Sequence, residues 1–188
     1  MSGIIHRYTD IDDRWRWRLI DGDGHVIASG AETFDTEEGL ADRLASLSGW
    51  VSDVPRHVVE GAVLYHDPVG DLLLIDEVGD VVTTGHTGRT PVSTSDDRRG
   101  VDTKRPVEVL DTADVDLQMA IDDVPIVVGD HGLFVCHRGH DGEWRWTWHL
   151  ATGPVCESGE GYASVAHVTK HVQRFTGLLP TAEVRTWG

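Results

Sequence analysis

Hydrophobic and polar residues alternate along two tryptophan-rich stretches, one near each end of this 188-residue chain. Residues 14–19 read Arg-Trp-Arg-Trp-Arg-Leu and residues 144–150 read Trp-Arg-Trp-Thr-Trp-His-Leu, and together they hold five of the seven tryptophans. A period of two residues is typical of a strand with one buried side and one solvent-facing side. We therefore expect two central strands whose tryptophans face the core and whose arginines face away from it.

The same order of elements surrounds the first stretch. Strands are expected at 3–8, 14–20 and 25–29, with an Asp-Gly hairpin turn at 21–24. A helix should follow, capped by Asp35 or Thr36 and ended by Gly49, because leucines recur on one face between them. This order gives a β-β-β-α unit.

The C-terminal stretch repeats this order. Strands are expected at 133–137, 143–150 and 155–158, and a helix capped by Ser164 should run to Gly177. Residues 184–187 read as a tail that adds an edge strand.

The middle of the chain resembles a degenerate third copy. Strands are expected at 62–66, 72–75 and 80–84, and a helix is expected after Thr112. Residues 72–75 form a continuous apolar run, which is typical of a strand buried on both faces. The chain therefore divides into a first repeat at 1–49, a degenerate repeat at 50–130 with a long polar insert at about 85–107, a third repeat at 131–178 and a tail at 179–188.

Two segments of the third copy carry a family resemblance. Residues 142–146 read Gly-Glu-Trp-Arg-Trp and residues 157–164 read Glu-Ser-Gly-Glu-Gly-Tyr-Ala-Ser, and this pattern resembles the YegP-like family. The first copy matches through 15–19 and 28–30 but has Ala-Glu-Thr-Phe at 31–34, where the family has Glu-Gly-Tyr. The resemblance covers roughly 4–49 and 131–177, and thinly 61–125.

The resemblance implies an α+β fold of tandem β-β-β-α repeats that form antiparallel sheets with helices packed on one face. Units of the family pair within one chain or across a homodimer, and the family brings neither catalytic residues nor a cofactor. Pairing has a physical basis, because a unit of about 50 residues lies near the limit of independent stability.

The charge balance is strongly acidic, with 32 acidic residues against 16 basic ones and a net charge of −16. Aspartate predominates, and only two of the basic residues are lysines. This composition favours adaptation to molar salt, and the alternative is an acidic protein that binds basic partners. It argues against a generic nucleic-acid binder. No transmembrane run and no signal peptide are recognisable, so a cytoplasmic protein without membrane contact is expected.

Two groups of basic residues are candidate binding sites. Arg14, Arg16 and Arg18 lie opposite the tryptophans of the first stretch, and Arg145 adds to them from the third copy. Their guanidinium groups suit phosphate or carboxylate ligands, and the alternative is an outer face paired with neighbouring aspartates. The second group lies in the insert and consists of Arg98, Arg99, Lys104 and Arg105, which suit a partner or a nucleic-acid backbone.

Metal and catalytic motifs are weak. His167 and His171 stand four apart on the last helix, but the His-Glu-x-x-His motif of metalloproteases is absent. Cys136 and Cys156 are expected to be buried free thiols. We therefore expect no catalytic residue, no metal and no cofactor.

The sequence thus favours a non-enzymatic interaction protein that binds a protein partner, forms a homodimer through repeat pairing, or binds a small polyanion through its arginine faces. The alternative is a nucleic-acid or ribonucleoprotein-associated factor that uses the basic insert, and a metal-dependent enzyme ranks third.

Overall fold

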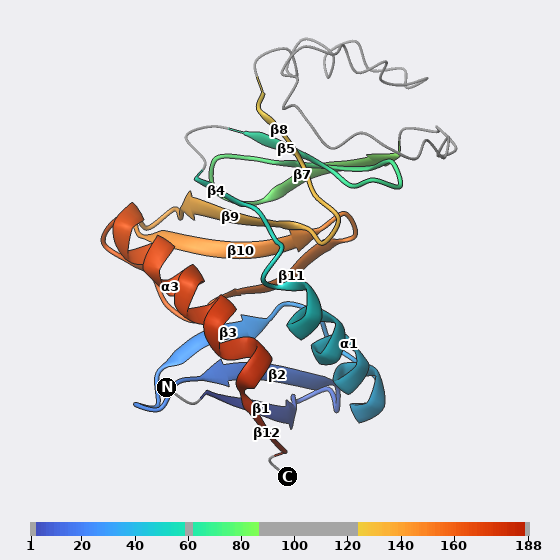
Figure 1. Ribbon diagram of the computed structural model, residues 1–188, viewed down its shortest axis with the longest axis vertical. Coiled ribbons are helices and arrows are strands. Elements are labelled where there is room, and N and C mark those ends of the chain that lie inside the picture. The colour runs from blue at the N-terminus through green and yellow to red at the C-terminus, as the bar shows by residue number, and fades with distance from the viewer. Residues whose placement is uncertain (1–2, 59–61, 87–123, 187–188) are drawn as a thin grey trace.

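The strands form an eight-stranded sheet and a four-stranded sheet, and the helices pack on the eight-stranded one (Figure 1). The computed structural model describes residues 3–58, 62–86 and 124–186. The elements are β1 (Ile4–Thr9), β2 (Trp15–Ile20), β3 (Val26–Gly30), α1 (Glu37–Trp50), β4 (Arg56–Val58), β5 (Val63–His66), β6 (Asp71–Ile75), β7 (Val81–His86), β8 (Ile126–Val128), β9 (Leu133–Arg138), β10 (Trp144–Leu150), β11 (Gly153–Ser158), α3 (Val165–Leu178), the 3-10 helix η1 (Leu179–Thr181) and β12 (Glu183–Thr186).

The eight-stranded sheet joins the first and third units edge to edge. Its strand order is β12-β1-β2-β3-β11-β10-β9-β4. The third strands of the two units, β3 and β11, meet as an antiparallel pair with Ser29 opposite Glu157. Each unit also sends a fourth strand to the other: β4 runs parallel to β9, and β12 runs parallel to β1. The two units therefore exchange their last strands about an approximate two-fold axis.

The α+β class, the repeated β-β-β-α order and the packing of helices on a sheet are confirmed. The sheets are mixed, however, and not wholly antiparallel as expected. The parallel pairs come from the fourth strands, and of these β4 and β12 follow a helix and not a hairpin turn. A helix carries the chain across the sheet before it forms its last strand, so strand direction is no longer set by a tight turn.

The middle unit forms the four-stranded sheet, in the order β7-β6-β5-β8. Its fourth strand, β8, runs parallel to β5 of the same unit, so the middle unit exchanges no strand. The apolar run of β6 is buried on both faces as expected, with Leu73 and Ile75 fully buried and Leu72 and Leu74 nearly so. The helix expected after Thr112 lies outside the described residues.

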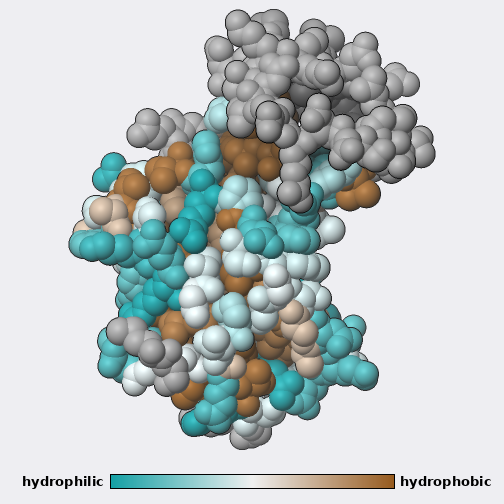
Figure 2. Space-filling view, in the orientation of Figure 1, coloured by the Kyte–Doolittle hydropathy of each residue, from teal (hydrophilic) through white to brown (hydrophobic). Residues whose placement is uncertain are grey.

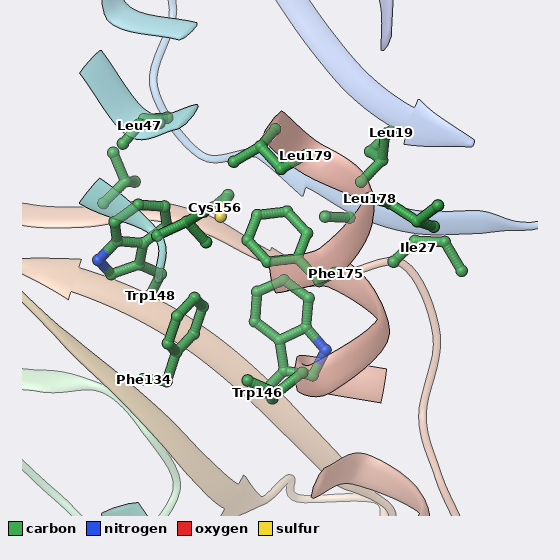
Figure 3. Packing of buried hydrophobic residues seen from close by; sticks show 14 of the residues in the cluster. Leu19, Ile27, Leu47, Phe134, Trp146, Trp148, Cys156, Phe175, Leu178 and Leu179 are labelled. Carbon is green, nitrogen blue, oxygen red and sulfur yellow. The ribbon is translucent and has the colours of Figure 1, made fainter. Parts of the chain in front are cut away.

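The tryptophan side of the central strands builds the main core, as the alternation predicts. Trp17, Trp146 and Trp148 are at most 1% exposed and lie under the helices. Figure 3 shows the ring of Phe175 from α3 beside Trp146, and their ring centroids are 4.8 Å apart. The helices begin where expected, because the side chains of Thr36 and Ser164 accept hydrogen bonds from backbone N–H groups of the first turn.

Two details of the expected units are wrong. Both helices run one residue past the glycine that was expected to end them, α1 to Trp50 and α3 to Leu178. The reason is the same in both: the N–H groups of Val51 and Leu179 still bond to the carbonyls of Leu47 and Phe175. The second side of β10 is not solvent-facing, because Thr147 is 8% exposed and His149 only 1%. The four-stranded sheet covers that side through a second cluster that joins Val63, Tyr65, Leu73 and Ile75 to Leu133 and Val135.

The β6–β7 turn shows how closely the two sheets pack. Gly79 has a φ of +88°, and a Cβ atom added there would lie 2.5 Å from the ring of His137 on β9. The β2–β3 turn has the same form, since Gly24 has a φ of +90°, yet a Cβ atom there would meet nothing within 4 Å. In both turns an aspartate side chain, Asp76 or Asp21, accepts backbone N–H bonds.

These two glycines give a matched test of sheet packing. Each Gly→Ala change should lower the free energy of unfolding by about 1 kcal/mol because alanine disfavours positive φ. Gly79→Ala should lower it by about 1–3 kcal/mol more, because the methyl group displaces His137. Denaturant unfolding of both variants at constant KCl measures the difference. Equal losses would show that the turn does not pack against His137.

Candidate functional site

The helix-free face of the eight-stranded sheet differs between its two halves. Over the third unit it is covered by the four-stranded sheet. Over the first unit it presents the side chains that alternate with the core residues of β12, β1, β2 and β3. We call this surface the open face; it consists of Ile4, His6, Tyr8, Arg16, Arg18, Ile20, Val26, Ser29, Glu183 and Arg185.

Strand register brings these side chains together. His6 lies opposite Arg18 on the neighbouring strand, and Tyr8 lies opposite Arg16. Arg18 in turn lies opposite Ser29 of β3, and His6 opposite Arg185 of β12. Paired residues share a face of the sheet, with Cα atoms about 5 Å apart. The open face is therefore a polar and basic row that crosses four strands.

Three of the four predicted arginines in the described residues are held by carboxylates. The guanidinium of Arg14 lies 3.1 Å from Asp35, next to α1 and before β2 begins. Arg16 donates to Asp10 at 2.5 Å, and this contact lowers the pKa of the Asp10 carboxyl. For these residues the structure agrees with the simpler expectation of an outer face paired with aspartates.

Arg145 is bound in the same way in the third unit. It donates to Asp141 at 2.8–2.9 Å and lies 3.5 Å from Glu143. The hydrogen bond from Arg145 lowers the pKa of the Asp141 carboxyl to about 2. Arg145 lies far along the sheet from Arg16 and Arg18, so the structure does not bring the predicted set together.

Arg18 is different. Among the described residues no carboxylate lies within ion-pair distance of it, and its Nε is buried without a hydrogen-bond partner. Its guanidinium carbon lies 5.6 Å from the ring centroid of Tyr8, which is a cation–π contact. Arg56 and Arg138 also have no ion pair in the described part of the chain, but they donate hydrogen bonds to Thr176 and to the carbonyl of Gly142.

In the third unit the equivalent helix-free face is covered by the four-stranded sheet. Trp15 and Trp144 form equivalent bridges to Phe34 and Tyr162, which aligns the two units. In this alignment Arg145 takes the place of Arg16, and Thr147 that of Arg18. Where the first unit exposes an arginine, the third unit has a small buried residue under a second sheet.

The covered face contains two buried histidines, His137 and His149. His149 is 1% exposed, and neither ring nitrogen has a hydrogen-bond partner in the described part of the chain. His137 contacts the Thr147 hydroxyl at 3.2 Å through Nε2. Burial lowers the pKa of His149 to about 4 and also lowers the pKa of His137.

A possible cation site is already neutralised. Ligand atoms of Asp21, Asp23 and His25 lie within 4.8 Å of one another. Asp21 is buried, however, and its second oxygen lies 2.8 Å from the guanidinium of Arg174 on α3. This ion pair ties the β2–β3 turn of the first unit to the helix of the third, so we assign it a structural role.

The other candidate ligands are dispersed or engaged. The Nδ1 atom of His171 is 2.9 Å from the hydroxyl of Tyr162. Cys136 and Cys156 are buried free thiols as expected. They pair with Trp146 and Trp148 on opposite edges of β10, which places them about 10 Å apart, beyond disulfide reach.

The basic insert predicted from the sequence belongs to the part of the chain that the structure does not describe. Arg98, Arg99, Lys104 and Arg105 lie outside the described residues, so their role stays a prediction.

Apolar side chains are exposed at the level of the four-stranded sheet, as Figure 2 shows. Val69, Val82 and Val128 are among the exposed valines, with 57–62% of each residue's surface accessible. This sheet adjoins the undescribed chain between 86 and 124, so we assign no site to it. No helix of the described residues is long and apolar enough to span a membrane.

The fold and the face together define a protein of paired β-β-β-α units with one helix-free face open. The family model described as "Domain of unknown function (DUF1508)" matches residues 10–49. The match is confined to the first unit, and the resemblance to the YegP-like family is confirmed there.

Two solved structures resemble the whole chain. One is the UPF0339 protein from Shewanella oneidensis, with 10% identity, a TM-score of 0.48, and 99% of this chain and 93% of that chain covered. The other is the protein of unknown function yegP from E. coli, with 10% identity, a TM-score of 0.45, and 100% and 97% covered. No curated protein matches the chain significantly.

Proposed function

We propose that this chain is a non-enzymatic binding protein that holds an acidic protein partner on the open face. The observation that carries the proposal is the contrast between the two halves of the sheet. The helix-free face of the third unit is covered by a β-sheet of the same chain, whereas the face of the first unit is not covered by described residues.

The chemistry of the open face supports an acidic partner. Tyr8, Ile4 and Ile20 supply half-buried apolar surface, and Arg18 supplies a cation that forms no ion pair with a carboxylate of the described residues. Interfaces are enriched in tyrosine and arginine, and complementary charge favours one partner over others. The chain carries a net charge of −16, so a local basic face restricts where an acidic partner can bind.

Affinity capture at native salt tests the proposal. The bait is the full chain, compared with Arg18→Thr, which places the third unit's residue on the open face. Arg145→Gln is the control, because it removes the same charge from an arginine that Asp141 already neutralises. We expect specific proteins to be captured by wild type and Arg145→Gln, and at least several-fold less by Arg18→Thr.

The same captured proteins at the same yield with all three baits would overturn the proposal. Mass measurement of the complex in multimolar KCl then identifies the partner as a second copy of this chain or as a different protein. Both are protein partners on the open face.

A further inference from the structure

We infer that Arg18 is the anchor of the open face and that it receives one carboxylate of the partner, between His6 on one side and Ser29 on the other. The inference rests on the proposed function and adds the residue and the chemical group that are recognised. It separates Arg18 from Arg14, Arg16 and Arg145, which look equivalent in the sequence.

The first argument is availability. Arg16 and Arg145 donate hydrogen bonds to Asp10 and Asp141, and Arg14 lies in an ion pair with Asp35. Arg18, in contrast, has no ion pair among the residues that the structure describes. Its buried Nε–H lacks a hydrogen-bond partner. A buried donor without an acceptor is unfavourable, so an oxygen from a ligand would satisfy a group that the chain leaves unsatisfied.

The second argument is orientation. The guanidinium of Arg18 stands over the ring of Tyr8 with 5.6 Å between carbon and centroid. A guanidinium held in this way loses little further freedom when it binds, and its planar N–H groups match the two oxygens of a carboxylate. His6 and Ser29 are the register partners of Arg18, so both flank the approaching group.

The third argument is the surrounding charge. Arg16 and Arg185 lie on the same face but carry their own carboxylates, Asp10 and Glu183. Glu157 lies opposite Ser29, two strands from Arg18, and forms no ion pair with it. Glu157 therefore repels an incoming carboxylate, and its removal should strengthen binding.

Potassium acetate is the probe for the anchor, with inorganic phosphate as the comparison, both titrated at constant KCl. The readout is the Nε–Hε NMR signal of each arginine in the full-length protein, assigned by its loss in the matching variant. We expect a saturable shift with acetate at Arg18, and no saturable shift at Arg16 or Arg145.

Variants sharpen the result. Arg18→Lys keeps the charge but loses the planar fork, so acetate should bind roughly tenfold more weakly, followed at the His6 ring signals. Glu157→Gln should bind about twofold or more tightly, and Arg145→Gln should bind as the wild type does. Phosphate binding without acetate binding would overturn the carboxylate assignment.

The two proposals fail separately. No saturable acetate shift at Arg18, with partner capture still lost in Arg18→Thr, would overturn the anchor and leave the proposed function standing. Capture that is unaffected by Arg18→Thr would overturn the proposed function whatever acetate does.

Discussion

Replacing Trp146 by alanine is expected to lower the free energy of unfolding by about 3–5 kcal/mol, as for other large buried aromatic residues. The Trp146 side chain is fully buried, and its ring lies 4.8 Å from Phe175 and 5.7 Å from Phe134 between centroids. The change removes contacts with both the helix and the neighbouring strand, and the rigid sheet closes the resulting cavity only in part.

Trp144 is the matched control, because it lies in the same strand and on the same face but is only half-buried at the end of the sheet. Trp144→Ala should lower the free energy of unfolding clearly less than Trp146→Ala does. Both variants are compared by denaturant unfolding at constant KCl, followed by far-ultraviolet circular dichroism because the change removes a fluorophore. Equal losses at the two positions would contradict the central place of Trp146 in the core.

The period of two was enough to predict which side of each central strand is buried. The Asp-Gly turn predicted the first hairpin, and Thr36 and Ser164 predicted both helix caps, because these features also depend on residues close together in the chain. The period of two failed for the opposite side of β10, where Thr147 and His149 look like solvent-facing residues. They are buried because a sheet from another part of the chain covers them, and no local pattern reports such a contact.

The pairing of the fourth strands could not be predicted from the sequence for a related reason. β4 and β8 have three residues each and β12 has four, too few to show a period. Their partners are the first strands of units, and for β4 and β12 the pairing depends on where the preceding helix ends. Only β12 was expected as an edge strand, from its place after the last helix.

The candidate site shows the same division. Alternation places Arg16 and Arg18 on one face, and the structure agrees. Which arginine lacks an acidic partner depends on Asp10 folding back onto Arg16, and on the fact that no comparable turn reaches Arg18. His6 and Tyr8 join the face because β1 alternates too, a signal that was present in the sequence but was not used.

Lowering the pH from about 6.5 to 4 should weaken the fold through His149, before most carboxylates titrate. The pKa of buried His149 is lowered to about 4, from 6.5 for an ordinary histidine. The unfolded chain therefore takes up a proton at a higher pH than the folded chain does. The contribution of neutral His149 to the free energy of unfolding is fully present above about pH 6.5. It falls by about 3 kcal/mol as the pH is lowered to 4.

The neighbouring charges are arranged so that His149 dominates this loss. His137 faces the same sheet interface, and burial lowers its pKa as well, but Asp76 and Asp80 of the β6–β7 turn oppose that shift. His149 has only the additional repulsion of His137. Protonation of His149 thus places an uncompensated charge between the two sheets, and the four-stranded sheet should separate from β9 and β10 first.

His149→Ile tests this directly, because Ile20 occupies the equivalent position in the first unit. The variant should lose about 3 kcal/mol less between pH 6.5 and 4 than the wild type, measured by denaturant unfolding across that range at constant KCl. The control is His140→Gln, which removes an exposed histidine from the β9–β10 turn and should leave the wild-type slope unchanged. A slope that survives His149→Ile would assign the acid sensitivity to other groups and remove His149 from the interface between the sheets.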